Sequence, residues 1–214
     1  MKTEELVALL AKDADAVAPD ATARRFTTAL GWGVCGTTLA VAIMMGVRPD
    51  IAKAVAMPMF WIKLAFPAWI AIAAYYAATR LARPGVRLGR APGTALAALV
   101  AVMWVLAIVT LFNAAPVERS ALFFGDTWRF CLVSIPLFSI PGFGAAMWAM
   151  KGLAPTRLAL AGGAAGLLAG AVSAAAYSLH CPEMELPFLA VWYVLGMSVP
   201  AIAGTVIGPR MLHW

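Results

Sequence analysis

Charged side chains are scarce in this sequence: only 12% of its 214 residues are Asp, Glu, Lys or Arg, whereas 63% are hydrophobic. That apolar share is far above the share in a soluble domain, which is nearer half. The shortage of charge therefore excludes an ordinary soluble domain and predicts a membrane protein.

Motifs that carry enzyme chemistry are lacking as well. The sequence contains no glycine-rich nucleotide loop, no HExxH pair and no CxxC, which are short patterns with a known chemical use. We therefore expect neither an enzyme nor a bound cofactor.

What the sequence does have is long apolar stretches, six of them, each long enough to cross a hydrocarbon core of about 30 Å as a helix. They predict an all-α membrane protein with six transmembrane helices. The predicted spans cover residues 27–46, 60–79, 94–112, 130–150, 158–179 and 188–208.

Lys and Arg predict the orientation, because these residues accumulate in cytoplasmic loops. With both termini inside, the cytoplasmic side carries eleven of them and the outer side five. Four of the eleven lie in the short loop "TRLARPGVRLGR". We expect an N-in, C-in protein of the bacterial inner membrane, in contact with lipid. The net charge of +6 is then a topology signal and does not indicate nucleic-acid binding.

Residues 1–26 differ from the rest and are predicted to form a separate cytoplasmic segment before a transmembrane domain at 27–214. They contain five acids, so they lack the basic start and apolar run of a cleaved signal peptide, and we expect the protein to keep them. The segment has the pattern of a short amphipathic helix. Its apolar stripe is Leu6, Leu9 and Leu10, and the acids at the positive end of the helix are Glu4 and Glu5.

A single short helix cannot bury such a stripe by itself, so this segment needs a partner. A helix that lies on the membrane is one interpretation, but five acids oppose adsorption to an anionic leaflet. We therefore expect a protein partner with a basic surface.

Two of the three cysteines are predicted on the same side of the membrane. Cys131 begins the fourth span and Cys181 follows the fifth, so two spans separate them and both face outward. Disulfides form in that compartment and not in the cytosol. The pair therefore favours a linked redox or metal role, with two unrelated interfacial cysteines as the alternative. Cys35 lies in the middle of the first span, where a thiol is usually a small packing residue.

The stretch "SLHCPEMELPF" adds further polar groups around Cys181. His180 offers an imidazole, Glu183 and Glu185 offer oxygen ligands, and thiolates with imidazole suit soft or borderline metals. The candidate metal ligands are Cys131, Cys181 and His180. An ordinary solvated loop is the alternative interpretation.

Lys63 is a charged residue inside a predicted span, and it lies near the helix end, where its side chain can snorkel to the interface. With Arg129 it is a candidate to stabilise a thiolate. Arg129 is only two positions from Cys131, however, so a helix turns it to another face. The middles of the spans otherwise lack the ionisable groups that transport pathways usually need. A small-molecule or metal transporter remains the alternative function.

Two sequence patterns concern how the helices bend and pack. Trp, Ser and Pro match in "WRFCLVSIP" and "WYVLGMSVP", which favours three helical hairpins with a proline-bent second helix; interfacial Trp and common proline kinks are the alternative. The stretch "AGGAAGLLAG" spaces three glycines four apart, which predicts close approach of another backbone. The prolines at the predicted bends are Pro67, Pro136 and Pro200, and the spaced glycines are Gly162, Gly166 and Gly170.

The stretches "MKTEELVALLAKDADAV", "FCLVSIPLF", "APTRLALAGGAAGLLAGAVSAAAYSLHCPE", "FLAVWYVLGM" and "GPRMLHW" together resemble the six-helix membrane anti-sigma factors called negative regulators of sigma F. The resemblance covers nearly the whole chain, and "HCPE…WY" is its most specific part. It implies a protein that binds an extracytoplasmic-function (ECF) sigma factor and releases it under oxidant or heavy-metal stress. It further implies that the family's paired cysteines are Cys131 and Cys181, and that the N-terminal segment binds sigma.

Overall fold

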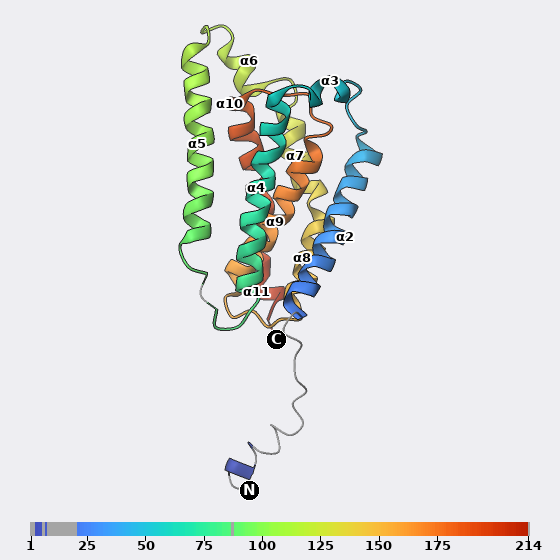
Figure 1. Ribbon diagram of the computed structural model, residues 1–214, viewed down its shortest axis with the longest axis vertical. Coiled ribbons are helices and arrows are strands. Elements are labelled where there is room, and N and C mark those ends of the chain that lie inside the picture. Colours follow the sequence, from blue (N-terminus) through green and yellow to red (C-terminus); the bar gives the residue numbers. More distant parts are fainter. Residues whose placement is uncertain (1–2, 6, 8–20, 87, 214) are drawn as a thin grey trace.

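The computed structural model describes residues 3–5, 7, 21–86 and 88–213 (Figure 1). Their regular structure is entirely helical, with no strand among them. Near the N-terminus, Glu4 and Glu5 are helical and exposed. The predicted apolar stripe lies outside the described residues, at Leu6, Leu9 and Leu10.

Six helical segments of the described chain are long and apolar enough to cross a membrane, which confirms the predicted all-helical fold with six candidate spans. Helices suit this environment because they satisfy their own backbone hydrogen bonds. The first three are α2 (Ala21–Met44), α4 (Pro58–Leu81) and α5 (Ala91–Asn113), with the short α3 (Ile51–Val55) between α2 and α4. The fourth consists of α6 (Arg119–Phe124), α7 (Trp128–Phe138) and α8 (Ile140–Lys151). The fifth is α9 (Leu158–Tyr177), and the sixth consists of α10 (Leu186–Phe188), η1 (Leu189–Tyr193) and α11 (Val194–Met211).

Helix α9 lies at the centre of the bundle and α5 at its edge (Figure 1). More than half of α9 is buried, and it packs against α4, α8, α11 and α2. Helix α5 is the most apolar span and the least buried, and its contacts are with α4, α6, α10 and η1. The core is therefore built around α9, while α5 leaves most of its surface exposed on the outside of the bundle.

The glycine stripe of α9 packs directly on α11. A Cβ atom added to Gly166 would collide with the carbonyl group of Pro200, and one added to Gly162 would collide with the carbonyl group of Gly204. Without side chains at these positions the two backbones come close enough for extensive van der Waals contact. The predicted close approach is confirmed.

The three prolines lie inside helices, and the fourth span is also broken. Pro67, Pro136 and Pro200 are within α4, α7 and α11. The break between α7 and α8 falls at Ser139, whose hydroxyl donates to the carbonyl of Pro136 at 2.6 Å. The sixth span contains a π-helical turn, η1, in the part that packs with Cys131 and Cys181. Such turns often mark functional sites. The three-hairpin repeat stays a prediction.

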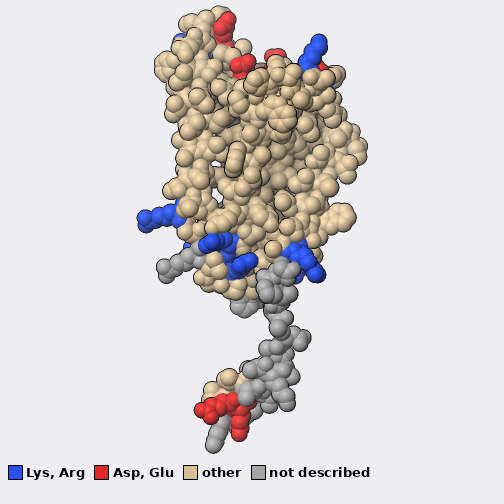
Figure 2. Space-filling model, viewed as in Figure 1, with Lys and Arg blue, Asp and Glu red and all other residues tan. Residues whose placement is uncertain are grey.

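The bundle has two chemically different ends (Figure 2). We call the end where α2 begins and α11 ends the basic end, and the opposite end, which carries Cys131 and Cys181, the cysteine end. Within residues 21–86 and 88–213, the basic end has eight cations and no acid, and the cysteine end has five cations and five acids. The basic end carries Arg24, Arg25, Arg80, Arg83, Arg90, Lys151, Arg157 and Arg210; the acids are Asp50, Glu118, Asp126, Glu183 and Glu185.

Candidate functional site

The two predicted cysteines share one hydrophobic cluster at the cysteine end. Cys131 lies in the first turn of α7, and Cys181 lies in the connection between α9 and α10. Both thiols are free and fully buried, and they pack with Tyr177, Tyr193 and Ile135. Both cysteines therefore lie inside the bundle, and their linked redox or metal role stays a prediction.

Cys35 lies elsewhere. It is on α2 and exposed on the outer surface of the bundle, away from the cluster of Cys131 and Cys181. It was expected to be a small packing residue, and in the structure it is exposed and does not pack within the chain. In a membrane an exposed mid-span thiol faces lipid, which accepts its weak polarity.

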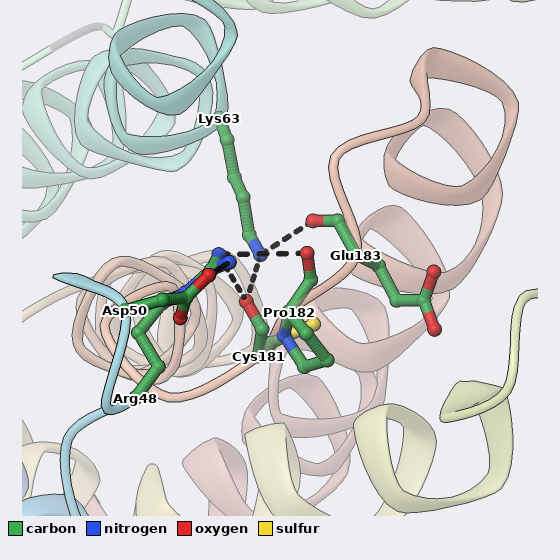
Figure 3. Close-up of polar contacts among 6 residues, drawn as sticks. All are labelled: Arg48, Asp50, Lys63, Cys181, Pro182 and Glu183. Carbon is green, nitrogen blue, oxygen red and sulfur yellow. Dashed lines mark hydrogen bonds and ion pairs between the residues drawn. The ribbon is translucent and has the colours of Figure 1, made fainter. Parts of the chain in front are cut away.

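Two cations bind the backbone of the segment that we call the HCPE loop, residues 180–183 (Figure 3). The Nζ atom of Lys63 donates to the carbonyl oxygens of Cys181 and Glu183, both at 2.6 Å. Arg48 donates to the carbonyls of Cys181 and Pro182 at 3.5 and 3.4 Å. Three consecutive carbonyl groups thus accept hydrogen bonds from cationic side chains.

Lys63 is fully buried, at 0% exposure, although its position near a helix end predicted that it snorkels to the interface. That prediction is wrong, because α4 turns this side chain toward the HCPE loop, where carbonyl groups replace the water around the ammonium. The ring of Tyr193 lies 5.8 Å from Nζ and adds a cation–π contact. The carboxylate of Glu183 points away from Lys63 (Figure 3).

Arg48 connects the HCPE loop to the segment between α2 and α3. Its guanidinium forms an ion pair with Asp50 at 2.6 Å, and its backbone N–H donates to the carbonyl of Leu179 at 3.1 Å. The hydrogen bond from Arg48 lowers the pKa of Asp50, and the same bond raises the pKa of Arg48. Both charges therefore persist at neutral pH, and Arg48 stays available to the loop.

The side chains of the HCPE loop bind neighbouring connections. A ring nitrogen of His180, Nδ1, is 3.0 Å from the carbonyl oxygen of Gly46. Glu183 Oε1 accepts from the backbone N–H of Asp126 at 2.9 Å and from the hydroxyl of Thr127 at 3.3 Å. His180 and Glu183 thus attach the loop to the ends of α2 and α7, which is not how an ordinary solvated loop behaves.

Gly125 is needed where Glu183 crosses the connection between α6 and α7. It has a positive φ of 54°, and a Cβ atom there would lie 2.7 Å from the Glu183 carboxylate. The positive φ favours glycine, and the missing side chain leaves room for the Glu183 carboxylate where it now lies. The glycine in "FFGDTW" therefore lets the connection between α6 and α7 lie against the Glu183 carboxylate of the HCPE loop.

The remaining predicted site residues lie outside this network. Arg129 is exposed and lies over the ring of Trp128, 5.1 Å from its centroid. Glu185 is exposed and makes no side-chain cap to α10. Within the described ranges, no three His, Cys, Asp or Glu residues are grouped to bind a metal ion. The polar neighbour of the Cys181 sulfur is the hydroxyl of Thr127, at 3.9 Å.

Sequence reasoning missed several residues of this network. Arg48, Asp50 and Thr127 have no motif around them, and the charge count treated Arg48 only as an outer-loop cation. A second contact was also missed: the rings of Trp128 and Trp192 lie 4.7 Å apart, and the Trp192 indole N–H donates to the carbonyl of Phe123 at 2.8 Å. The matched Trp positions in "WRFCLVSIP" and "WYVLGMSVP" were the available signal.

Comparison with known proteins adds a second kind of evidence. The family model described as negative regulator of sigma F matches residues 10–214. The probable anti-sigma-F factor NrsF of Azospira oryzae is 48% identical over 214 residues, and the anti-sigma-F factor NrsF of Caulobacter vibrioides is 36% identical over 218 aligned positions. Each alignment covers 100% of both chains. No solved structure matches the chain.

Proposed function

The chain belongs to the family of negative regulators of sigma F, and we propose that it is a membrane-bound anti-sigma factor that sequesters a sigma factor of the ECF type. The observation that carries this proposal is its similarity, along the whole chain, to two proteins named anti-sigma-F factors. A transporter, the alternative, has no comparable support.

The proposed topology places the basic end in the cytoplasm of a bacterial inner membrane. Eight described cations without an acid are typical of cytoplasmic loops. The N-terminal segment precedes α2 at this end, so it reaches the compartment where a sigma factor is found. We propose that its apolar stripe binds sigma, with the acids beside it facing a basic surface; the stripe is Leu6, Leu9 and Leu10, and the acids are Glu4 and Glu5.

The proposed signal is a change at Cys131 and Cys181. An oxidant that accepts two electrons would convert the two thiols into one disulfide and release two protons. Their place in one cluster supports a linked role, and their burial means that the reaction requires a local opening. A soft metal bound by the two thiolates is the second chemistry; for His180 to join it, the contact of Nδ1 with the Gly46 carbonyl has to be accommodated.

The HCPE loop is suited to transmit such a change, because it binds the connections around it. Its contacts reach α4 through Lys63, the end of α2 through His180, and the start of α7 through Glu183. Moving sigma from 99% bound to 99% free takes about 5.5 kcal/mol. A disulfide supplies a few kcal/mol, and rearranged hydrogen bonds to charged groups supply about 1.5–3 kcal/mol each.

Co-purification tests the anti-sigma proposal. Full-length protein, isolated from membranes of its own cells, should retain a sigma factor as its cytosolic partner. A variant that begins at Arg24, three residues into α2, should lose the sigma factor while its six spans still insert. In the full chain, the double variant Leu9→Asp, Leu10→Asp should also lose sigma, because it puts unpaired charges into the contact. Lys12→Ala serves as the control in the same segment. Retention of sigma by both the truncated and the double variant would refute the proposed binding segment.

A further inference from the structure

Lys63 is an unusual residue for the interior of a membrane protein. Its side chain has no exposed surface, and its ammonium donates to two carbonyl oxygens at 2.6 Å. Burying a charge is expensive, and a methionine of similar shape would avoid that cost. An ionisable residue inside a span is by default a functional candidate.

The two acceptors define what Lys63 does. They belong to Cys181 and Glu183, the residues on either side of Pro182, so one ammonium binds both ends of a short turn (Figure 3). Arg48 contributes less to this turn, because its bonds to the loop are 3.4 and 3.5 Å long and its shortest bonds go to Asp50. Of these two cations, Lys63 is therefore the stronger donor to the HCPE loop backbone.

The orientation of the turn decides where the Cys181 sulfur lies. With the carbonyl oxygen of Cys181 bonded to Lys63, its side chain is fully buried and its sulfur lies near Thr127. Reagents in water cannot reach a thiol at 0% exposure unless the loop opens. The bonds to Lys63 oppose that opening.

We propose that Lys63 is a positioning residue that keeps the Cys181 thiol inside the bundle, so that reaction of this thiol requires release of the HCPE loop from α4. The inference deepens the proposed function, because it makes opening of the loop the step that controls access to the sensor. It concerns the loop alone, however, and its test requires no sigma factor.

The test measures how fast Cys181 reacts with a water-soluble maleimide in full-length protein in lipid nanodiscs, where both faces are accessible. A background with Cys35→Ala and Cys131→Ala leaves Cys181 as the reactive thiol. Lys63→Met should raise the labelling rate by about tenfold or more, because losing hydrogen bonds to a charged group makes opening that much more favourable. Lys63→Gln keeps an amide donor and should give a smaller rise. Lys53→Met, an exposed lysine on α3 at the same end, should match the background.

Labelling of Lys63→Met at the background rate, with an unchanged helical spectrum, would overturn the proposal. If Lys63→Met does not insert, Lys63→Gln decides the question by the same rate, since its neutral amide ends one bond short of the position of Nζ and cannot reproduce both bonds to the loop carbonyls. A background rate in that variant would equally overturn it. Fast labelling of the Lys63 variants, together with unaltered sigma release in Lys63 variants that keep all three cysteines, would uphold the positioning role and count against the proposed sensing step.

Discussion

The two ends of the bundle are joined by different kinds of contact. In the half toward the basic end, α9 and α11 meet through glycines, with Gly162 and Gly166 against the carbonyls of Gly204 and Pro200. At the cysteine end, side chains bind carbonyls across helices, with Lys63 and Arg48 on the HCPE loop. Two closely packed backbones cannot rearrange by rotating a side chain. Side-chain hydrogen bonds, in contrast, can break one at a time. We therefore expect the basic half to hold the fold and the cysteine end to be the part that rearranges.

The cations of the two ends also differ in how deeply they are buried. Cations of the basic end are mostly exposed, as Figure 2 shows, whereas Lys63 and Arg48 at the cysteine end are buried. Exposed cations contribute little to stability and set orientation in the membrane. Buried cations require partners, and here their partners are the carbonyls beside a thiol.

The largest effect is expected in the glycine contact. Gly166→Leu places a side chain against the Pro200 carbonyl, which belongs to a helix backbone and cannot move aside. Overpacking of this kind should lower the free energy of unfolding by about 3 kcal/mol, the upper part of the usual range. Thermal unfolding of the protein in detergent measures it.

Gly144→Leu is the matched control, because no atom lies within 4 Å of a Cβ added there on α8. Equal melting temperatures for Gly166→Leu and the parent protein would show that α9 and α11 do not pack as closely as described.

A smaller loss is expected at the cysteine end. Glu183→Gln removes the charge from the acceptor of the Asp126 N–H and the Thr127 hydroxyl. Hydrogen bonds to charged groups contribute about 1.5 kcal/mol or more, and partial exposure of this carboxylate favours the lower figure. Glu185→Gln, two residues along and exposed, should leave the melting temperature unchanged. The same loss in both variants would mean that the contact at α7 is not specific.

The smallest effect is a dependence on pH at Asp50. Its pKa in the folded protein lies below the unbonded value of 3.8, because Arg48 donates a hydrogen bond to it. The contribution is therefore complete above the unfolded pKa and disappears as the pH falls through the folded one. The melting temperature should fall less for Asp50→Asn than for the parent between about pH 5 and about pH 3. Parallel curves for the two proteins would contradict the Arg48–Asp50 bond.

The parts of this architecture that could be predicted are those encoded by local patterns. Runs of apolar residues gave six spans, and glycines four apart predicted a backbone contact because spacing on a helix determines the face. Because two spans separate Cys131 from Cys181, the sequence also predicted that both cysteines lie at the same end of the bundle. The break at Ser139 falls between Pro136 and Pro141, and these prolines with Gly142 predicted that the fourth span has the most interrupted backbone. The π-helical turn left no comparable signal.

The environment of the cysteines could not be predicted, because it depends on contacts between distant segments. Lys63 and the carbonyl of Cys181 are separated by 118 positions, and no rule about helix ends says that this lysine points inward. The same holds for Arg48, whose loop meets the HCPE loop only after the bundle has formed. Their charge alone predicted that Lys63 and Arg48 lie at the surface, whereas both side chains are buried in the structure.

The central claim is that Cys131 and Cys181 control release of a sigma factor bound at the other end of the protein. The most direct measurement is a reporter gene that depends on that sigma factor, with and without a thiol oxidant, at matched membrane levels of each variant. The double variant Cys131→Ser, Cys181→Ser should repress the reporter as the parent protein does and should no longer respond to the oxidant, while Cys35→Ser should respond normally. A full response in the double variant would contradict the account.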